Sequence, residues 1–525
     1  MSTLGPGAAG GTPAAGRAGK RGRVVMLVDN KVEGDSRVQK EARSAAERGW
    51  DVVLLGKSPD RQTHRWALGD ARVRLVPVAM PLARRRYEFR RAPLRAPLAY
   101  PEGRGLPGYA RQKAQARRAE VRLRRDRLRA RIDDQGPSLS LLPQRAWVFA
   151  SRAYAKAYAE LVERRVASTE SLREARQRMD APLDRLTTSL WSKALGQRAW
   201  RRLDPSLWDW ELAYGPVIDE LKPDLIHAND FRMLGVGARA AVRARAEGRD
   251  TKLVWDAHEF LPGINPWNSH PRWHPAMIAH EKEYAPYADA VVTVSETMVE
   301  LLTAAHRLRR APVIVRNAPT VGADGLPEGR PGVRDLCGLA PDVPLLLYVG
   351  TMTPARGIDI MVDTLDRLPG VHVGFVARES KNLQRILDKA RDLGVADRVH
   401  HLPYVAVDEI CGYIASADVG VFPAIHLPNH EVDLPTKFYE YAQARLPMVV
   451  SDVKTTAETT RQLGVGEVFV AEDEADYLRA VRAVLDDPKR YAEAYDAAQP
   501  VLSQWMWDHQ ADVLDEVYTS LLDPS

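Results

Sequence analysis

Cysteine is scarce in this sequence: only Cys337 and Cys411 occur among its 525 residues. They lie far apart and lack the spacing of paired metal ligands, so neither a disulfide framework nor a zinc site is indicated. Long apolar runs are also missing, because no stretch approaches the roughly 18 to 20 residues that span a bilayer, and the N-terminus has no signal-type apolar core. We therefore expect a cytoplasmic protein, either free or peripheral on the inner face of the cell membrane.

Two short motifs of nucleotide and metal chemistry are absent as well. The first β-α-β unit contains no G-x-G-x-x-G, so a plain dinucleotide site is not indicated. No Asp-x-Asp motif stands in a metal-binding context, and helix dipoles together with cations can stabilise anionic charge in place of a metal. We expect neither a cofactor nor a required metal ion.

The chain does contain enough apolar sequence, 45% of its residues, for two or three domains with full cores. Apolar strands alternate with amphipathic helices in two blocks, which predicts an α/β protein with parallel sheets. The first block has expected strands at 23–29, 51–55, 74–78, 224–230, 252–260, 289–296 and 313–319. The second has expected strands at 344–350, 371–379, 398–405, 418–424 and 448–450.

These blocks divide the chain into expected domains. A Gly, Ala and Pro tail over 1–20 is expected to be disordered, and a stretch dense in Gly and Pro between Asn317 and Pro344 connects the two blocks. We expect a first domain over 21–315, a second over 316–500 and a C-terminal helix over 501–525.

The stretch from Leu434 to Asp452, LPTKFYEYAQARLPMVVSD, carries the most chemistry. It predicts a short helix opened by Pro435 and followed by a strand. The first amides of such a helix, at Thr436 and Lys437, have no intrahelical acceptor and can bind an anion. Glu440 lies on the same face as Lys437. A cation and free amides for phosphate, with a carboxylate for two hydroxyls, suit a nucleoside diphosphate.

This stretch resembles the nucleotide-sugar signature of retaining glycosyltransferases of family 4, and the residues that carry the resemblance are Leu434, Pro435, Lys437, Glu440, Tyr441 and Pro447. The resemblance implies two Rossmann-like domains facing a cleft, the GT-B architecture. It also implies a nucleotide-sugar donor in the second domain, with Glu440 on its ribose, and an acceptor in the first.

The first domain resembles the same family at two places. The segment GDSRVQKEARSAAERGWDVVLL resembles its first β-α-β unit, which makes Gly34, Asp35 and Arg37 candidates for contact with the acceptor or cleft. The motifs HAND and DAHE resemble one subset of the family. His258 matches the family's cleft histidine near the transferred sugar, Asn229 and Asp230 are further cleft candidates, and His227 is a weaker one.

The second domain agrees with the family pattern less completely. Its glycine turn at Gly350 is followed by Thr351 where the family has an Arg, and Arg356 stands near the position of a family Lys. One phosphate-binding cation is thus missing, and Arg378 or Lys437 is expected to supply it. The resemblance places the base near Tyr404, Val405 and Asp408.

The sugar contact is the other departure. The family places a glutamate eight residues before the one matched by Glu440, but Val432 occupies that position with Glu431 one step away. Either Glu431 moves into place through a loop change or the contact is lost. The expected catalytic residues are His258, Arg356 and Lys437.

A basic segment, 84–205, interrupts the first domain. Between Arg84 and Asp134 there are 17 Lys and Arg against 6 Asp and Glu, a balance of +11 in a chain whose net charge is +6. Its helices carry a thin apolar stripe of Val121, Leu123, Leu128 and Ile132. Three interpretations stay open: helices on an anionic membrane surface, a site for a polyanion, or a solvated hairpin packed on its own domain. Nucleic acid is less favoured because interleaved aromatic residues are lacking.

The resulting hypothesis is a retaining glycosyltransferase that acts on a lipid-linked acceptor or a cell-surface polysaccharide precursor. Two alternatives stay open. An epimerase of the same architecture would turn over a nucleotide sugar without any acceptor, and a catalytically degenerate protein would bind a nucleotide sugar only. The sequence names neither the sugar, nor the base, nor the acceptor.

Overall fold

The computed structural model describes residues 21–80, 82, 96–100, 106–136, 138–178, 182–264, 271–320 and 326–523. The expected disordered tail, 1–20, lies outside these residues. The chain divides into two compact units. The first comprises Met1–Ala79, Leu207–Asn265 and Met277–Ser525, and the second comprises Met80–Ser206 and Pro266–Ala276. The basic segment predicted at 84–205 falls within the second unit.

The first sheet has eight strands in the order β3-β4-β2-β1-β5-β6-β7-β8. All neighbours are parallel except the edge pair β3 and β4. The strands are β1 (Arg23–Leu27), β2 (Asp51–Lys57), β3 (His64–Leu68), β4 (Ala71–Val76), β5 (Leu225–Asn229), β6 (Lys252–Ala257), β7 (Ala290–Thr293) and β8 (Val313–Ile314). Helices cover both faces of a parallel sheet, which explains why its central strands are apolar on successive residues.

The helices of this sheet follow its strands. Asp35 caps the first of them, because its Oδ1 accepts a hydrogen bond from the Val38 amide at 3.3 Å. The helices are α1 (Ser36–Glu47), α7 (Leu207–Leu221), α8 (Asp230–Ala246), α9 (Trp273–Tyr284) and α10 (Glu296–Ala305), with 3-10 turns η3 (Leu261–Gly263) and η4 (Ala285–Tyr287).

The second sheet has six parallel strands in the order β11-β10-β9-β12-β13-β14. Its strands are β9 (Leu345–Val349), β10 (His372–Val376), β11 (Val399–Leu402), β12 (Val419–Phe422), β13 (Met448–Ser451) and β14 (Gly466–Phe469). Its helices are α11 (Val333–Cys337), α12 (Asp359–Asp363), α13 (Lys381–Asp392), α14 (Ile410–Ile414), α15 (Pro428–Val432), α16 (Thr436–Gln443), α17 (Lys454–Leu463), α18 (Glu474–Asp486) and α19 (Pro488–Leu502). Short 3-10 turns lie between them: η6 (Pro354–Arg356), η7 (Leu365–Arg367), η8 (Ala396–Arg398) and η9 (Ser503–Trp505). Together the two sheets give the two Rossmann-like domains expected for the GT-B architecture.

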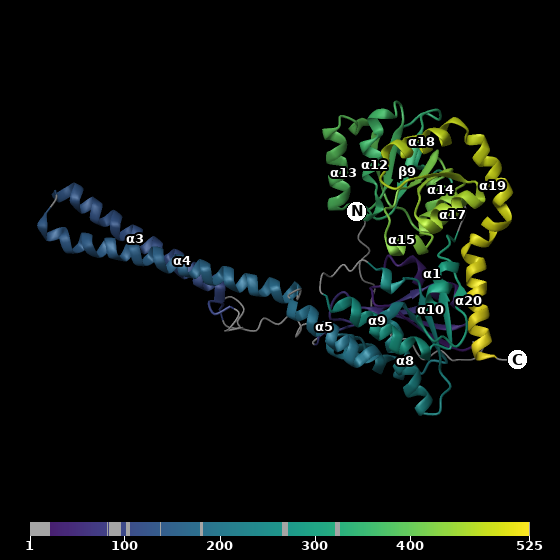
Figure 1. Ribbon diagram of the computed structural model, residues 1–525, viewed down its shortest axis with the longest axis horizontal. Helices are drawn as coiled ribbons and strands as arrows, with labels where there is room; N and C mark the ends of the chain where they lie inside the picture. The colour runs from purple at the N-terminus through teal and green to yellow at the C-terminus, as the bar shows by residue number, and fades with distance from the viewer. Residues whose placement is uncertain are drawn as a thin grey trace. The chain divides into compact units, whose positions relative to one another are not determined.

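The last helix, α20 (Trp507–Leu522), belongs to the core of the first sheet (Figure 1). Trp507, Leu514 and Tyr518 are buried among first-domain residues, and the Tyr518 ring meets Trp50 edge to face at 5.9 Å. The chain therefore enters the second domain once and returns to the first at its end.

The second unit is built on an antiparallel helical hairpin, whose two long helices lie side by side (Figure 1). The hairpin consists of α3 (Leu106–Gln135), the turn η1 (Leu139–Leu141) and α4 (Leu142–Arg178). The shorter elements α5 (Pro182–Leu195), η2 (Gly196–Arg198) and α6 (Trp200–Leu203) follow it. Among the described helices none has the length and apolarity needed to cross a bilayer.

Candidate active site

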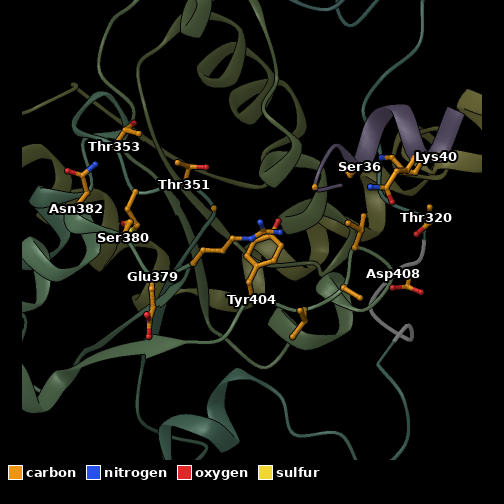
Figure 2. Close-up of a pocket in the computed structure, with 18 of the residues that line it drawn as sticks. Ser36, Lys40, Thr320, Thr351, Thr353, Glu379, Ser380, Asn382, Tyr404 and Asp408 are labelled. Carbon is orange, nitrogen blue, oxygen red and sulfur yellow. The ribbon is translucent and has the colours of Figure 1, made fainter. Parts of the chain in front are cut away.

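A pocket of about 720 Å³ lies between the carboxyl ends of the two sheets. One wall is the start of α1, and the opposite wall consists of the loops after β9, β10 and β11. Figure 2 shows Ser36 and Lys40 on one side of the pocket and Thr353, Ser380 and Asn382 on the other, with Tyr404 between them. Ligands of open α/β sheets gather at this end of the strands.

The α1 wall presents one face of the helix. Ser36, Gln39, Lys40 and Arg43 line the pocket, and their spacing of three, one and three residues places them together on one side of a helix. Sequence reasoning named only Arg37 on this helix, besides Gly34 and Asp35 in the loop before it. The helical period of these polar residues is the signal that would have identified the wall.

The loop that leads into α1 is held by its own hydrogen bonds. The Asn30 amide donates to Asp35 Oδ2 at 2.7 Å, and Asn30 Oδ1 accepts from the Val32 amide at 2.7 Å. Val32 is buried and has φ of 69°, an unusual conformation for a β-branched residue. The loop therefore presents Gly34 to the pocket in one defined conformation.

The glycine turn after β9 is the opposite wall. Gly350 has φ of 119°, and a Cβ there would lie 3.5 Å from Cε and Nζ of Lys437. The backbone conformation favours glycine here. The Lys437 ammonium thus lies directly behind the turn that lines the pocket.

Lys437 is a nearly buried cation, 8% exposed, at the start of α16. Its Nζ lies 5.1 Å from the Tyr348 ring centre and 5.0 Å from that of Phe422. Burial, together with the nearby Arg356, lowers the pKa of Lys437 to about 7, against the opposing effect of Glu440. A bound anion would reverse this shift because it favours the charged form.

Glu440, one turn further along α16, is 6% exposed. Burial raises the pKa of its carboxyl, and the ammonium groups of Lys437 and Lys40 oppose the rise. Lys40 comes from the first domain, where its Nζ donates to Asn317 Oδ1 at 2.9 Å and to the carbonyl of Ala318. The carboxylate of Glu440 is therefore close to a cation from each domain.

Thr436, the first residue of α16, is tied to the interdomain connection. The Asn317 amide donates to Thr436 Oγ1 at 2.9 Å, while Asn317 Oδ1 accepts from Lys40. This chain of hydrogen bonds fixes the start of α16 relative to α1. The backbone amides of Thr436 and Lys437 remain without an intrahelical acceptor.

Arg378 spans the pocket from the loop after β10. Its guanidinium carbon lies 5.5 Å from the centre of the Tyr404 ring, and its terminal nitrogens lie 3.8 Å from the position a Cβ would take at Gly34. Arg378 is therefore a cation that faces both domains, on the same wall as Thr351.

The first domain also contains a closed ionic cluster beneath its sheet edge. Arg37 donates to both oxygens of Asp256, at 2.7 and 3.0 Å, and lies 3.1 Å from Glu41. Tyr518 Oη of α20 is 2.5 Å from His227 Nδ1, and His227 Nε2 is 3.7 Å from Glu41. All five side chains are buried. The sequence predicted that Arg37 would contact the acceptor or the cleft. In the structure Arg37 belongs to this buried cluster and does not line the pocket.

Three members of this cluster, Glu41, His227 and Asp256, have their ligand atoms within 4.8 Å of one another. Such a group has the donor types of a metal site. Here the single guanidinium of Arg37 contacts both carboxylates. Burial, together with Asp256, raises the pKa of Glu41 and favours its neutral form, so one cation is matched with one ionised carboxylate.

His258 follows β6 above this cluster. Its Nδ1 lies 3.6 Å from Asp256 Oδ1, and 28% of its side chain is exposed. Burial acts to lower the pKa of His258, but Asp256 outweighs it and raises the pKa to about 10. His258 is therefore an imidazolium at neutral pH.

The two candidates after β5 lie beside it. Asn229 is fully buried, and neither its amide nitrogen nor its oxygen has a hydrogen-bond partner within the described part of the chain. Asp230 adopts φ of 65°, and burial together with Glu259 raises the pKa of its carboxyl to about 8. The electrostatic influence of His258 on Asp230 places the two side chains near each other.

The two carboxylates that flank Val432 have different surroundings. Glu431 Oε1 is 2.6 Å from His426 Nδ1, its Oε2 accepts from the Lys454 amide at 2.7 Å, and its side chain does not line the pocket. Asp433 Oδ1 is buried without a hydrogen-bond partner among the described residues. Burial raises the pKa of Asp433 to about 7, although Arg37, His258 and Arg356 act to lower it. Asp433, which sequence reasoning missed, is thus a buried carboxylate within the electrostatic influence of Arg37, His258 and Arg356.

The backbone beside Asp433 is docked on the first domain, because Ser295 Oγ donates to the Val432 carbonyl at 2.6 Å. Arg356 lies in the same region, with its guanidinium 3.5 Å from His430 Nε2. These contacts bring the linker between α15 and α16 against the end of the first sheet.

Two family models match the chain: Glycosyltransferase Family 4 over residues 188–317, and Glycosyl transferases group 1 over residues 343–487. The chain is a family 4 type, group 1 glycosyltransferase. The two matches fall on the two Rossmann-like domains and leave the helical hairpin between 106 and 178 unmatched.

Curated relatives of this glycosyltransferase are identical to it at about a quarter of the aligned residues. The glycogen synthase of Mycobacterium tuberculosis is 26% identical over 309 residues, which is 57% of this chain and 69% of the relative. D-inositol 3-phosphate glycosyltransferase 1 of Catenulispora acidiphila is 28% identical over 324 residues, 57% of this chain and 73% of the relative.

Solved structures resemble the glycosyltransferase in fold. Sucrose-phosphate synthase from Thermosynechococcus elongatus has a TM-score of 0.59 at 13% identity and covers 96% of this chain and 100% of its own. HepE of Anabaena in complex with UDP has a TM-score of 0.55 at 13% identity, with 95% and 100% covered.

The glycosyltransferase pocket brings some of the predicted site residues together and not others. Those that line it are Gly34, Gly350, Thr351, Arg378, Tyr404 and Val405. Lys437, Glu440 and Thr436 lie behind its glycine turn and its α1 wall, as their contacts with Gly350, Lys40 and Asn317 show. Another group lies near the segment between α15 and α16, which contains Asp433, or at the adjoining end of the first sheet. This group comprises His258, Asn229, Asp230 and Arg356. Asp35 caps α1, Arg37 lies in the ionic cluster and Glu431 pairs with His426.

Proposed function

We propose that this enzyme is a retaining glycosyltransferase that takes a sugar from a nucleoside diphosphate donor bound against its second domain. The observation that carries the proposal is the pairing of Gly350 with Lys437. The turn lines the pocket, and the position that a Cβ would take at Gly350 is 3.5 Å from the nearly buried Lys437 ammonium, whose pKa burial and Arg356 lower to about 7. Such a cation is suited to an anionic ligand that supplies the missing charge.

The diphosphate would be held by several donors at once. The Lys437 ammonium approaches the Gly350 turn, and Arg378 lines the pocket beside it. The amides of Thr436 and Lys437, at the start of α16, would add further donors. Hydrogen bonds to charged groups contribute about 1.5 to 3 kcal/mol each. Arg378 would take the role of the family's arginine, whose position Thr351 occupies in this sequence. Glu440 would accept hydrogen bonds from the ribose hydroxyls.

At the other end of the donor, Asp433 and His258 would hold the sugar. Reaction breaks the bond between the anomeric carbon and the diphosphate oxygen, and an acceptor oxygen forms the new bond on the same face. The acceptor proton passes to the departing phosphate. Charge develops on that phosphate, where Lys437 and Arg356 stabilise it without a metal ion.

The acceptor would enter from the first domain, along the loop of Gly34 and the wall of Asn229 and Asp230. We propose a lipid-linked acceptor or a precursor of a cell-surface polysaccharide. The names of the relatives, which include a glycogen synthase and D-inositol 3-phosphate glycosyltransferases, are consistent with a hydroxyl-bearing carbohydrate or polyol acceptor.

The test is release of nucleoside diphosphate from a panel of UDP-, GDP-, ADP- and dTDP-sugars, with and without a detergent-dispersed lipid extract. We expect release from one donor that rises with the acceptor and falls about 10-fold or more in Glu440→Gln. Proton NMR of the product should show the donor's anomeric configuration. Release with inverted configuration would overturn the retaining mechanism. Interconversion of donors without an acceptor would identify an epimerase, and binding without turnover would identify a degenerate protein.

A further inference from the structure

The hairpin of α3 and α4 uses its apolar residues differently at its two ends. Toward the open end, Tyr100, Ala110, Ala114, Val162 and Val166 are buried together in a small core. Toward the turn no such core forms among the described residues, and four large apolar side chains are exposed close together in the sequence, whereas exposed ones such as Tyr109 and Leu161 occur singly in the other half. The four are Leu139 at 84%, Leu142 at 50%, Trp147 at 53% and Phe149 at 77%, which we call the turn patch.

Basic residues alternate with two members of this patch, Leu142 and Phe149, on one face of α4, whereas Trp147 lies on another face, toward α3. Leu142, Arg145, Phe149 and Arg152 follow one another at three, four and three residues, the spacing of a single helical stripe, and all four are exposed. Trp147 lies under a guanidinium, with Arg124 4.4 Å from its ring centre. The apolar atoms of the patch are thus interleaved with cations.

The opposite helix adds further unpaired charge. Within the described residues no ion pair or hydrogen bond holds the guanidinium groups of four arginines in the part of α3 near the turn, namely Arg122, Arg127, Arg129 and Arg131, and the same is true of Arg145 and Arg152 on α4. Over 106–178 there are 18 Lys and Arg against 8 Asp and Glu, a balance of +10. Two copies of such a surface would repel each other, which disfavours the hairpin as a self-association interface.

We propose that the turn patch docks the protein onto an anionic lipid surface. Aromatic and leucine side chains at the turn would enter the headgroup boundary, while the free arginines pair with lipid phosphates. A nucleic acid duplex would pair with the arginines, but it offers no apolar layer for the exposed leucine side chains beside them, Leu139 and Leu142. This function is separate from the transfer reaction, so the proposal stands apart from the proposed activity.

The experiment is co-sedimentation of the full chain with vesicles of equal parts phosphatidylglycerol and phosphatidylcholine, compared with phosphatidylcholine alone. We expect binding to the anionic vesicles that exceeds binding to the neutral ones about 10-fold at 0.1 M salt and weakens as salt rises. The double variant Trp147→Ser/Phe149→Ser should lose about 10-fold in affinity for the anionic vesicles. Both side chains are exposed, so the fold should tolerate their removal.

The matched control is Tyr109→Ser, which removes an aromatic side chain of similar exposure, 63%, from the other end of α3. It should bind the vesicles as the wild type does. The proposal is overturned if the wild type ignores anionic vesicles, or if both variants bind equally well. It is also overturned if the double variant loses instead a dimer seen by sedimentation velocity or the binding of a duplex DNA.

Discussion

The ionic cluster of the first domain and the α16 cluster of the second both bury charge at the edge of a parallel sheet, but they differ in how that charge is satisfied. Arg37, Asp256 and Glu41 pair with one another. Lys437 has no carboxylate within ion-pair distance among the described residues, and the pKa of its ammonium is lowered to about 7 by burial. Buried charges that pair internally hold structure, whereas a buried charge without a partner anticipates a ligand.

The largest expected effect is on the free energy of unfolding, and it comes from removing Arg37 from the ionic cluster of the first domain. Arg37→Met would leave Asp256 and Glu41 buried without their counter-ion, which costs about 3 to 5 kcal/mol of the free energy of unfolding. Urea denaturation followed by circular dichroism measures the change. Arg43→Met on the same helix, whose side chain is exposed at the pocket, should change the free energy of unfolding by less than about 0.5 kcal/mol. Equal stability of the two variants would contradict the structural role of Arg37.

A substitution at Lys437, which has no ion-pair partner among the described residues, should change the affinity for the nucleoside diphosphate rather than the free energy of unfolding. Lys437→Met removes a buried charge and keeps an apolar stem, so the protein should fold as well as the wild type or better. Its affinity for the nucleoside diphosphate should fall about 10- to 100-fold, as the loss of a charged hydrogen bond predicts. Isothermal titration calorimetry measures this affinity. Lys454→Met, at an exposed lysine of α17, is the control and should bind normally.

Glu431 and Asp433, on either side of Val432, allow the same comparison between a carboxylate that has hydrogen-bond partners and one that is buried without them. Asp433→Asn should lower kcat by about 10²-fold and leave affinity for the free nucleoside diphosphate nearly unchanged, because Asp433 lies near Arg37, His258 and Arg356, where we propose that the sugar binds. Glu431→Gln should leave kcat within about twofold, since Glu431 is already held by His426 and the Lys454 amide. The reverse order would assign the sugar contact to Glu431.

A smaller effect should appear in the pH dependence of binding. Burial lowers the pKa of Lys437 and of Lys40 to about 7, so both lose their charge in the free protein as the pH rises above that value. A bound diphosphate favours the ammonium form and raises these pKa values again. Binding at about pH 8 should therefore take up protons, and affinity should fall between about pH 7 and 9. Calorimetry in buffers of different ionisation enthalpy measures the uptake, which Lys437→Met should reduce.

Much of the fold could be read from periodicity. The expected strands of both sheets were found. They could be predicted because a strand that is buried on both faces has an unbroken run of apolar residues. Two strands were missed. β3, at His64–Leu68, is an antiparallel edge strand with alternate residues exposed, and β14, at Gly466–Phe469, is mostly half-buried at the other sheet's edge. Edge strands bury less surface and leave a weaker pattern.

The sequence by itself determined which residues open α16, because Pro435, Lys437 and Glu440 are neighbours along one helix and local chemistry fixes their arrangement. Only the tertiary structure determined the contacts of residues whose partners are distant in the chain. Arg37 was expected in the cleft, but Asp256, 219 residues away, holds it in the core. Glu431 and Asp433 are two residues apart, yet only the packing of the linker against Ser295 and α17 decides which of them is buried near His258. Sequence patterns report local spacing and burial, whereas the pairing of buried charges depends on contacts that only the folded chain makes.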